Sequence, residues 1–496
     1  MIYAAVEPDA TMRLRLPDPA GRAGAKRGKR LSPEVETGSP VAAVYDRRGT
    51  LRILFGGHRP PLQNTVWDQR ESTGSGCLRL RWGIGLLVGA ISFAQCAAAW
   101  TQEVYVWQRQ NGPALAAALD ATRASVDGFH VLAAEVAWRA GQPQIVRPAL
   151  DYARLAKLGR PVGLVLRVGP YGGPFSADDA AAGALKNLAS TLLIAAREGG
   201  LVPAELQIDF DCAEAKLAGF RVWLTALREA VGTTKLVFTV LPAWLKHDEF
   251  IALAHAADGF VLQVHSLEKP AGADQPFTLC DPERARVWID QASRVGVAFR
   301  VALPTYGYTI AFDRGGKFIG LSAEGPRPEW PAGTQVRVVR ADSRAMAQLS
   351  RKLAASPPPH CAGAIWFRLP VEGDRLNWAP ITLQAILAGE VPDERLTVQV
   401  EWSERGLAEI FVVNEGETTE PMPSKLTLRW PPGERLLASD GVGGFRLEMR
   451  RGQEQAAILA AHVPPDALLS PGQRGQVAWF RFSHELSLET NLPAPP

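Results

Sequence analysis

Residues 206 to 212 read LQIDFDC, which places two carboxylates two residues apart at the end of an otherwise apolar run. In an extended strand, alternation puts Gln207, Asp209 and Asp211 on one face and the apolar side chains on the other. Burying a carboxylate is costly unless it is paired or used. The stretch therefore predicts either a solvated strand edge or a chemical site.

Residues of related chemistry stand at the ends of other predicted strands. Glu135 adds a third carboxylate, and the substrate-binding candidates are Trp107, Arg167, Trp244, Gln263, His265, Tyr306 and Trp366. A sugar site needs carboxylates among aromatic rings, because ring C–H faces stack on aromatic side chains. One acid must also protonate the glycosidic oxygen while a second group stabilises the cation that forms. This set of residues favours carbohydrate chemistry.

Each candidate also has a structural interpretation. The two aspartates could accept hydrogen bonds or cap the next helix, and Glu135 could be a solvated rim residue. His265 could be a hydrogen-bonded wall residue, and Tyr306 and Trp366 could be core aromatics. We expect Arg167 to pair with a neighbouring carboxylate and hold Asp209 ionised.

The elements that must position these residues are short β-rich runs alternating with helical patterns. The runs cover residues 103–108, 129–136, 161–168, 205–210, 235–241, 259–265, 298–304 and 363–370. Eight strands with intervening helices predict a (β/α)8 TIM barrel over residues 100–390, with its chemistry at the C-terminal ends of the strands. A doubly wound sheet is the alternative, but no Gly-x-Gly-x-x-Gly turn follows the first strand.

Residues 391–496 have a different pattern. Alternating strands such as RLTVQVEW and QVAWFRFS are separated by Gly, Pro and Asn turns, which predicts a small all-β sandwich. Its tryptophans, Trp402, Trp430 and Trp479, could stack on glycans or belong to the core.

Residues 77–99 have the layout of a secretory signal peptide, with Arg79 and Arg81 before an apolar run and small residues near Ala99. A short buried helix and a lipoprotein box are the weaker alternatives. Residues 1–76 then form a disordered extension or follow from a start codon placed too far upstream. We expect a periplasmic or secreted bacterial protein without a stable membrane span after signal removal.

Charge and absent motifs narrow the function further. Residues 1–99 hold 14 Lys and Arg against 8 Asp and Glu, so the remaining chain is net acidic and gives no reason to expect nucleic acid. Cys212, Cys280 and Cys361 allow one disulfide at most and fit no zinc pattern. Serine hydrolase, zinc protease, nucleotide-binding and EF-hand motifs are absent from the sequence. We expect no cofactor and no metal.

The run LQIDFDC followed by AEAKLAGFRVWLTALRE resembles an uncharacterised bacterial family, a domain of unknown function with a glycoside hydrolase-like barrel. The resemblance covers residues 103–390. More distantly, three strand ends are similar to glycoside hydrolase family 18 chitinases: Asp209-x-Asp211, LPTYG at 303–307, and Trp366. These resemblances imply carboxylate acid/base chemistry on a polysaccharide or oligosaccharide.

The chitinase pattern is Asp-x-Asp-x-Glu, in which the Glu is the acid. Aligned directly on Asp209 and Asp211, it puts Ala213 in the Glu position; shifted by two residues, it puts Asp211 there. Two hypotheses follow. In the first, Asp211 donates the proton and Asp209 or Glu135 stabilises charge or activates water. In the second, the chain is a non-catalytic glycan-binding or cell-envelope protein.

Overall fold

The computed structural model describes residues 100–493, apart from 267, 269, 324–328, 450–454 and 462–466. The expected extension (1–76) and the whole of the expected signal segment (77–99) lie outside these residues. Within the described part of the chain, every helix is too short or too polar to cross a membrane.

Eight parallel strands form a closed barrel, as predicted. They are β1 (Thr101–Val106), β2 (Gly128–Arg139), β4 (Val162–Val168), β5 (Glu205–Phe210), β6 (Lys235–Val240), β7 (Gly259–Gln263), β8 (Phe299–Pro304) and β12 (Cys361–Phe367). Each pairs with its neighbour, and β1 closes the ring by pairing with both β2 and β12. The doubly wound alternative is wrong, because an open sheet leaves two unpaired edges.

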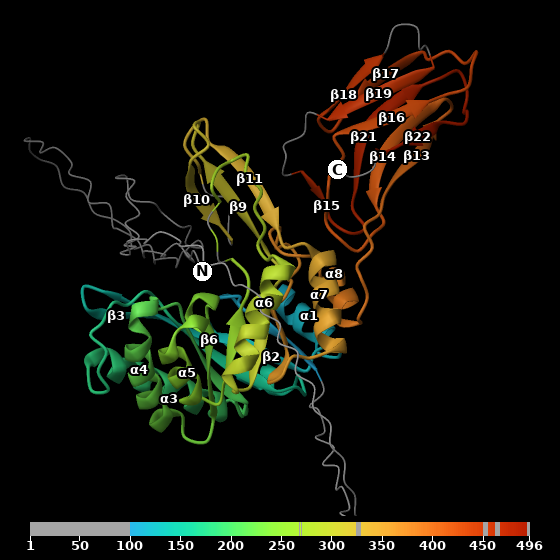
Figure 1. Ribbon diagram of the computed structural model, residues 1–496. Coiled ribbons are helices and arrows are strands. Elements are labelled where there is room, and N and C mark those ends of the chain that lie inside the picture. Colours follow the sequence, from blue (N-terminus) through green and yellow to red (C-terminus); the bar gives the residue numbers. More distant parts are fainter. Residues whose placement is uncertain are drawn as a thin grey trace, which may run out of the picture. The chain divides into compact units, whose positions relative to one another are not determined.

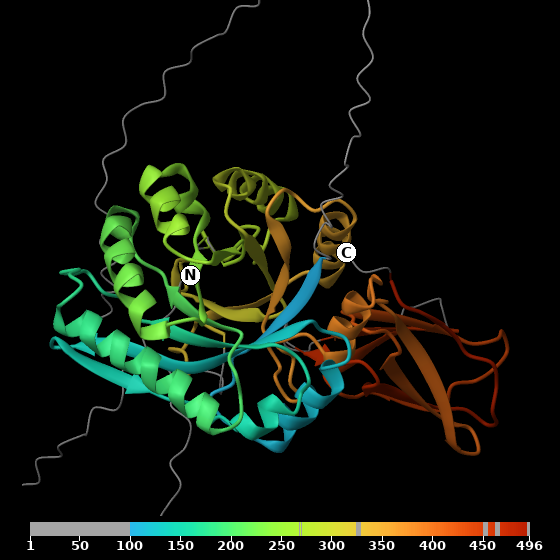
Figure 2. The ribbon, with the colours of Figure 1, turned by 90° about the horizontal axis from the view of Figure 1, so that it is seen from below.

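Helices connect the strands and lie outside the ring (Figures 1 and 2). They are α1 (Pro113–Thr122), α2 (Tyr152–Ala156), α3 (Ala180–Glu198), α4 (Leu217–Val231), α5 (Asp248–His255), α6 (Pro282–Ala292), α7 (Ser343–Ala355) and α8 (Pro380–Leu387). Aspartates begin several of them: Asp179, Asp281 and Asp342 each accept a backbone N–H of the first turn. These caps fix where the helices start.

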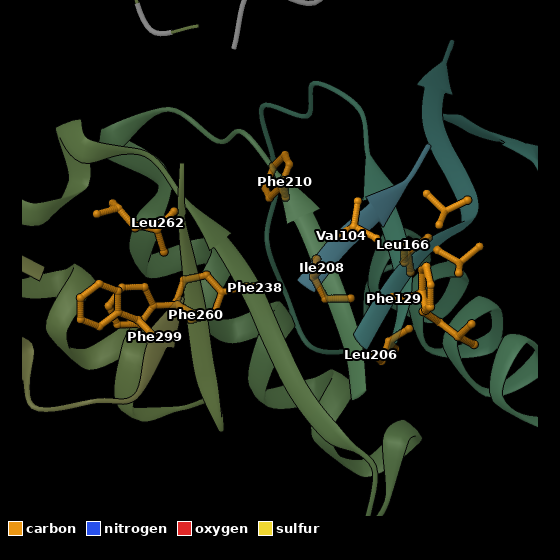
Figure 3. Close-up of a cluster of buried hydrophobic side chains, with 14 of the residues drawn as sticks. Val104, Phe129, Leu166, Leu206, Ile208, Phe210, Phe238, Phe260, Leu262 and Phe299 are labelled. Carbon is orange, nitrogen blue, oxygen red and sulfur yellow. The ribbon is translucent and has the colours of Figure 1, made fainter. Parts of the chain in front are cut away.

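Strand alternation divides the barrel into two cores. On β5, Leu206, Ile208 and Phe210 point outward into the layer between strands and helices (Figure 3). Phe260 and Phe299 stack in the same layer, with ring centroids 5.2 Å apart. The intervening side chains of each strand therefore fill the barrel interior.

The structure adds strands that the sequence analysis missed. β3 (Gln142–Val146) turns back antiparallel to the end of β2, and β9 (Gly307–Phe312), β10 (Phe318–Ser322) and β11 (Gln335–Arg340) form a small sheet between β8 and α7. Short 3-10 turns occur at Glu214–Lys216, Pro242–Lys246 and Ser293–Val295. β3, β10 and β11 are short and partly exposed, so their hydrophobic alternation is weak, whereas β9 is buried along its whole length and shows no alternation.

A buried charge network lies inside the barrel near the N-terminal ends of the strands. Arg300 donates to Glu103 and to Glu205, each at 2.6 Å, and His130 Nε2 lies 2.6 Å from the Glu103 carboxylate. Burial raises the pKa of Glu103, but His130 and Arg300 outweigh burial and lower the pKa to about 2. The carboxylate is therefore ionised and paired in the folded chain.

The C-terminal strands form two four-stranded antiparallel sheets over a separate hydrophobic core. One sheet has the order β13-β14-β21-β17 and the other β18-β19-β16-β22, with β15 and β20 paired apart. The strands are β13 (Leu396–Glu404), β14 (Leu407–Asn414), β15 (Glu420–Pro421), β16 (Lys425–Arg429), β17 (Ala438–Gly441), β18 (Phe445–Met449), β19 (Ala456–Ala461), β20 (Leu468–Leu469), β21 (Arg474–Arg481) and β22 (Glu489–Asn491). The predicted all-β architecture is confirmed.

The three described cysteines, Cys212, Cys280 and Cys361, are buried and free. Burial raises the pKa of each thiol to about 12. The described fold is therefore held together by packing and polar networks without a disulfide among these cysteines.

Replacing Glu103 with Gln should destabilise the protein by about 3 kcal/mol at pH 7, because Arg300 loses a buried partner. Folding lowers the Glu103 pKa from 4.5, so this stabilisation is complete above pH 4.5 and is lost as the pH falls toward 2. Denaturant unfolding at pH 7 and pH 3 measures the loss. Glu249→Gln, which breaks an exposed ion pair with Arg221, is the control and should cost less than about 1 kcal/mol. An equal loss for Glu103→Gln at both pH values would contradict the prediction.

Candidate active site

Strand β5 directs its polar residues into the barrel, and this alternation creates the site. Gln207 is fully buried and Asp209 is 5% exposed, while Asp211 follows the strand and is partly exposed. The hydroxyl of Tyr105 donates to Gln207 at 2.7 Å. The two aspartates thus lie at the C-terminal end of β5, where we define the mouth of the barrel.

Asp209 has one short hydrogen bond and one longer ion pair. Thr239 Oγ1 donates to Asp209 Oδ1 at 2.8 Å, and Arg167 Nε lies 3.9 Å from Oδ2. Burial and the Asp211 charge raise the pKa of Asp209 to about 6, although Arg167 and Thr239 oppose the rise. Asp209 therefore titrates within the range that acid/base chemistry uses.

Asp211 is the more accessible of the two carboxyl groups. Burial raises its pKa, and Arg167 acts in the opposite direction. A carboxyl group that keeps its proton at higher pH than usual is suited to donate it. Asp211 thus combines access to the mouth with the chemistry of an acid.

Glu135 on β2 is held by two arginines. Arg109 contacts both carboxylate oxygens, with Nε to Oε1 at 2.5 Å and Nη2 to Oε2 at 3.1 Å. Arg167 Nη1 lies 3.5 Å from Oε2. Since Arg167 also reaches Asp209, a chain of alternating charges runs from Arg109 to Asp209. The pairing of Arg167 with mouth carboxylates is as expected.

A cavity of about 10 Å³ lies beside Asp209 inside the barrel. Four residues proposed from the sequence line it, together with Tyr105, Thr239 and Phe367: they are Trp107, Asp209, Gln263 and His265. A volume of this size holds roughly one water molecule. The cavity is therefore a deep recess of the mouth and too small for a sugar ring.

His265 and two tyrosines form a hydrogen-bonded wall. His265 Nδ1 lies 3.3 Å from the Tyr306 hydroxyl, which lies 3.0 Å from the Tyr308 hydroxyl, and Tyr308 also bonds Ser266. Burial lowers the pKa of His265 to about 3, so the imidazole is neutral. Its buried Nε2 has no hydrogen-bond partner among the described residues, and His265 is one of the residues that line the cavity.

Two predicted aromatics lie away from the mouth. Trp366 points outward from β12, packs on Trp378 with centroids 5.9 Å apart and donates to Gln102 at 3.0 Å. Trp244 is buried beside Phe220 in the 3-10 turn after β6. Neither lines the cavity, and the geometry gives no support for a sugar contact by either side chain.

The sequence analysis did not propose Tyr105, Thr239 or Phe367, all of which line the cavity. Alternation could have identified two of them. Tyr105 has the same strand parity as Trp107, and Phe367 takes the inward position next to outward Trp366. Thr239 lacks such a signal, because a single threonine in an apolar strand is ordinary.

No group of three metal-ligating side chains is present among the residues that the structure describes. Asp209 and His265 line one cavity, but the second ring nitrogen of His265 faces Tyr306. The titratable and hydroxyl side chains at the mouth are suited to proton transfer, charge stabilisation and hydrogen bonding.

Several solved structures are similar at low identity. A chitinase from Chromobacterium violaceum is 18% identical over 59% of this chain and 98% of that chain, with a TM-score of 0.41. The spore cortex-lytic enzyme SleL from Bacillus cereus is 14% identical over 59% and 75%, also at 0.41. A family 18 N-acetylglucosaminidase from Paenibacillus barengoltzii is 14% identical over 58% and 99%, at 0.40. At TM-scores this low, the likenesses carry no inference about this chain.

No curated protein matches the chain. The model of the family described as "Domain of unknown function (DUF3142)" matches residues 158–372. This segment includes β4 to β8 and β12, with most of the side chains at the mouth. The match to residues 158–372 confirms the expected resemblance to an uncharacterised family with a (β/α)8 barrel.

Proposed function

We propose that the barrel mouth hydrolyses glycosidic bonds in a polysaccharide, with Asp211 as the proton donor. The observation that carries this proposal is the pair of carboxyl groups at the end of β5, Asp209 with a pKa of about 6 and Asp211 with a raised pKa. Two coupled acids with shifted pKa values can divide the roles of acid and charge stabiliser.

The surroundings assign a different task to each carboxyl group. Because the Asp211 charge raises the pKa of Asp209, the two carboxyl groups share one proton near pH 6, and the partly exposed Asp211 is the group that can pass this proton to the leaving oxygen. When Asp211 carries the proton, Asp209 is ionised, and Thr239 and Arg167 hold it where it stabilises the positive charge that develops on the sugar. Water then adds to the sugar, and its proton returns to the Asp211 carboxylate. Glu135 has its oxygens engaged by two arginines, so it fixes Arg167 in place and is less suited to activate water.

A second candidate is a non-catalytic glycan-binding or cell-envelope protein. The observation that favours it is the small volume of the cavity beside Asp209, about 10 Å³, which has room for roughly one water molecule and not for a pyranose ring. A glycan would then lie across the mouth without entering it. The layout of residues 77–99 supports export to the periplasm or secretion for either function.

Replacing Asp211 with Asn should lower kcat at least about 100-fold, because the side chain can no longer donate a proton. The measurement is reducing-end release by the full chain from chitin, peptidoglycan and bacterial exopolysaccharides. Asp290→Asn, an exposed position on α6, is the matched control and should leave the rate unchanged. Turnover by the native chain that survives in Asp211→Asn would refute the assignment. Glycan binding without turnover by the native chain would favour the second candidate.

Replacing Arg167 with Gln should move the acidic limb of the pH–rate profile upward by about one pH unit, because the Arg167 charge holds down the pKa of Asp209. Activity that needs ionised Asp209 rises through its pKa of about 6, so a higher pKa shifts the rise to higher pH. The measurement is kcat/KM as a function of pH from pH 4 to 9, which gives the position of the acidic limb. Arg154→Gln, in an ion pair with Asp120 on the helices, is the control. A lower rate with an unmoved limb would mean that Arg167 acts on substrate binding only.

A further inference from the structure

The three tryptophans of the C-terminal sandwich lie in different environments. Trp430 is 4% exposed and contacts Phe480 and Phe482 in the core. Trp402 packs against the same core. Trp479 lies on β21 between Ala478 and Phe480, which are both core residues, so its side chain points to the opposite, outer face of the sheet. Its indole is partly exposed there.

Carboxylates flank Trp479 on the neighbouring strands. The register pairs Trp479 with Asp440 of β17 on one side and with Glu409 of β14 on the other, and Glu409 pairs in turn with Glu401 of β13. Directly paired residues of antiparallel strands have Cβ atoms about 5 Å apart. One row across four strands therefore reads acid, tryptophan, acid, acid.

The next aromatic on this face is already covered. The Arg474 guanidinium lies 4.3 Å from the centroid of the Phe411 ring and forms an ion pair with Glu401. Arg481 similarly pairs with Glu404. Arginines thus compensate the carboxylates farther from Trp479, and Phe411 offers no free ring face on that side.

The two acids beside Trp479 have neutral hydrogen-bond donors. Glu409 accepts from Gln476 Nε2 at 3.1 Å, and Asp440 accepts from the backbone N–H of Gly441 at 2.8 Å. A carboxylate has about four acceptor sites, so each retains capacity for further donors. The row combines an apolar ring face with strong acceptors on both sides.

A sugar ring offers the complementary chemistry. Its C–H face packs on indole, and its hydroxyl groups donate to carboxylates. Glu409 and Asp440 form no ion pair with another described residue, so their negative charges would repel an anionic polymer such as a polyuronate or a nucleic acid. We propose that the outer face of the β13-β14-β21-β17 sheet binds a neutral polysaccharide, with one sugar ring on Trp479 and hydroxyls donated to Asp440 and Glu409. This site stands independently of the chemistry at the barrel mouth.

The test is depletion of the full chain from solution by insoluble chitin and by cellulose, with alginate gel as the anionic probe. Trp479→Ala should weaken binding to at least one neutral polymer about tenfold, or about 1.4 kcal/mol, because the sugar ring loses the indole face on which it packs. Trp479→Tyr should retain most of the binding, and Asp440→Asn should weaken it several-fold. Met449→Ala, an exposed apolar residue of the other sheet, is the matched control and should bind as the native chain does.

Three results would overturn the proposal. One is unchanged binding in both Trp479→Ala and Asp440→Asn, and another is binding to alginate alone. The third is loss of the folded circular dichroism spectrum in Trp479→Ala while Asp440→Asn binds normally, which would make Trp479 a packing residue. The two proposed sites are separable. Binding that is lost in Asp211→Asn but kept in Trp479→Ala locates the glycan at the mouth and refutes the sandwich site. Binding that depends on Trp479 in a chain without turnover refutes only the proposed hydrolase activity.

Discussion

Closing eight parallel strands into a barrel forces every second side chain into an interior without bulk water. The β5 residues Gln207 and Asp209 occupy that interior because Leu206 and Ile208 must face the helices. A one-residue slip in register would exchange the two faces and expose the outer core. The polarity of the interior is thus fixed by the packing outside it.

The interior meets the cost of buried charge in two different ways. Near the N-terminal ends of the strands, Arg300 neutralises Glu103 and Glu205, and the pKa values of both carboxyl groups are lowered despite burial. At the mouth, Arg167 is shared between Glu135 and Asp209, and the pKa of Asp209 stays raised. The Arg300 network has enough positive charge to compensate its carboxylates, whereas the carboxyl groups at the mouth are only partly compensated. Incomplete compensation leaves the pKa of Asp209 raised, and a raised pKa is common among carboxyl groups at functional sites.

The barrel could be predicted because each of its strands is a strongly apolar run of ordinary length. The residues that line the cavity could be predicted only in part. Candidates at the strand ends were chosen by residue type, but a shift of one position along a strand moves a side chain from the barrel interior to the outer face. Trp366 and Phe367 illustrate this, because the outward neighbour had the more suggestive chemistry. Trp244 lies in a 3-10 turn, where no strand alternation applies. The hairpin strand β3 was hidden by Pro143 and by the polar residues around it.

Because the three described cysteines are buried, the fold tolerates both oxidising and reducing surroundings. Thiol–disulfide exchange and oxidation proceed through the thiolate, and burial keeps Cys212, Cys280 and Cys361 protonated. An oxidant must therefore open the local structure before it can react with any of them. The described fold is, in this sense, indifferent to redox conditions, and its cores can form equally in a reducing or an oxidising compartment.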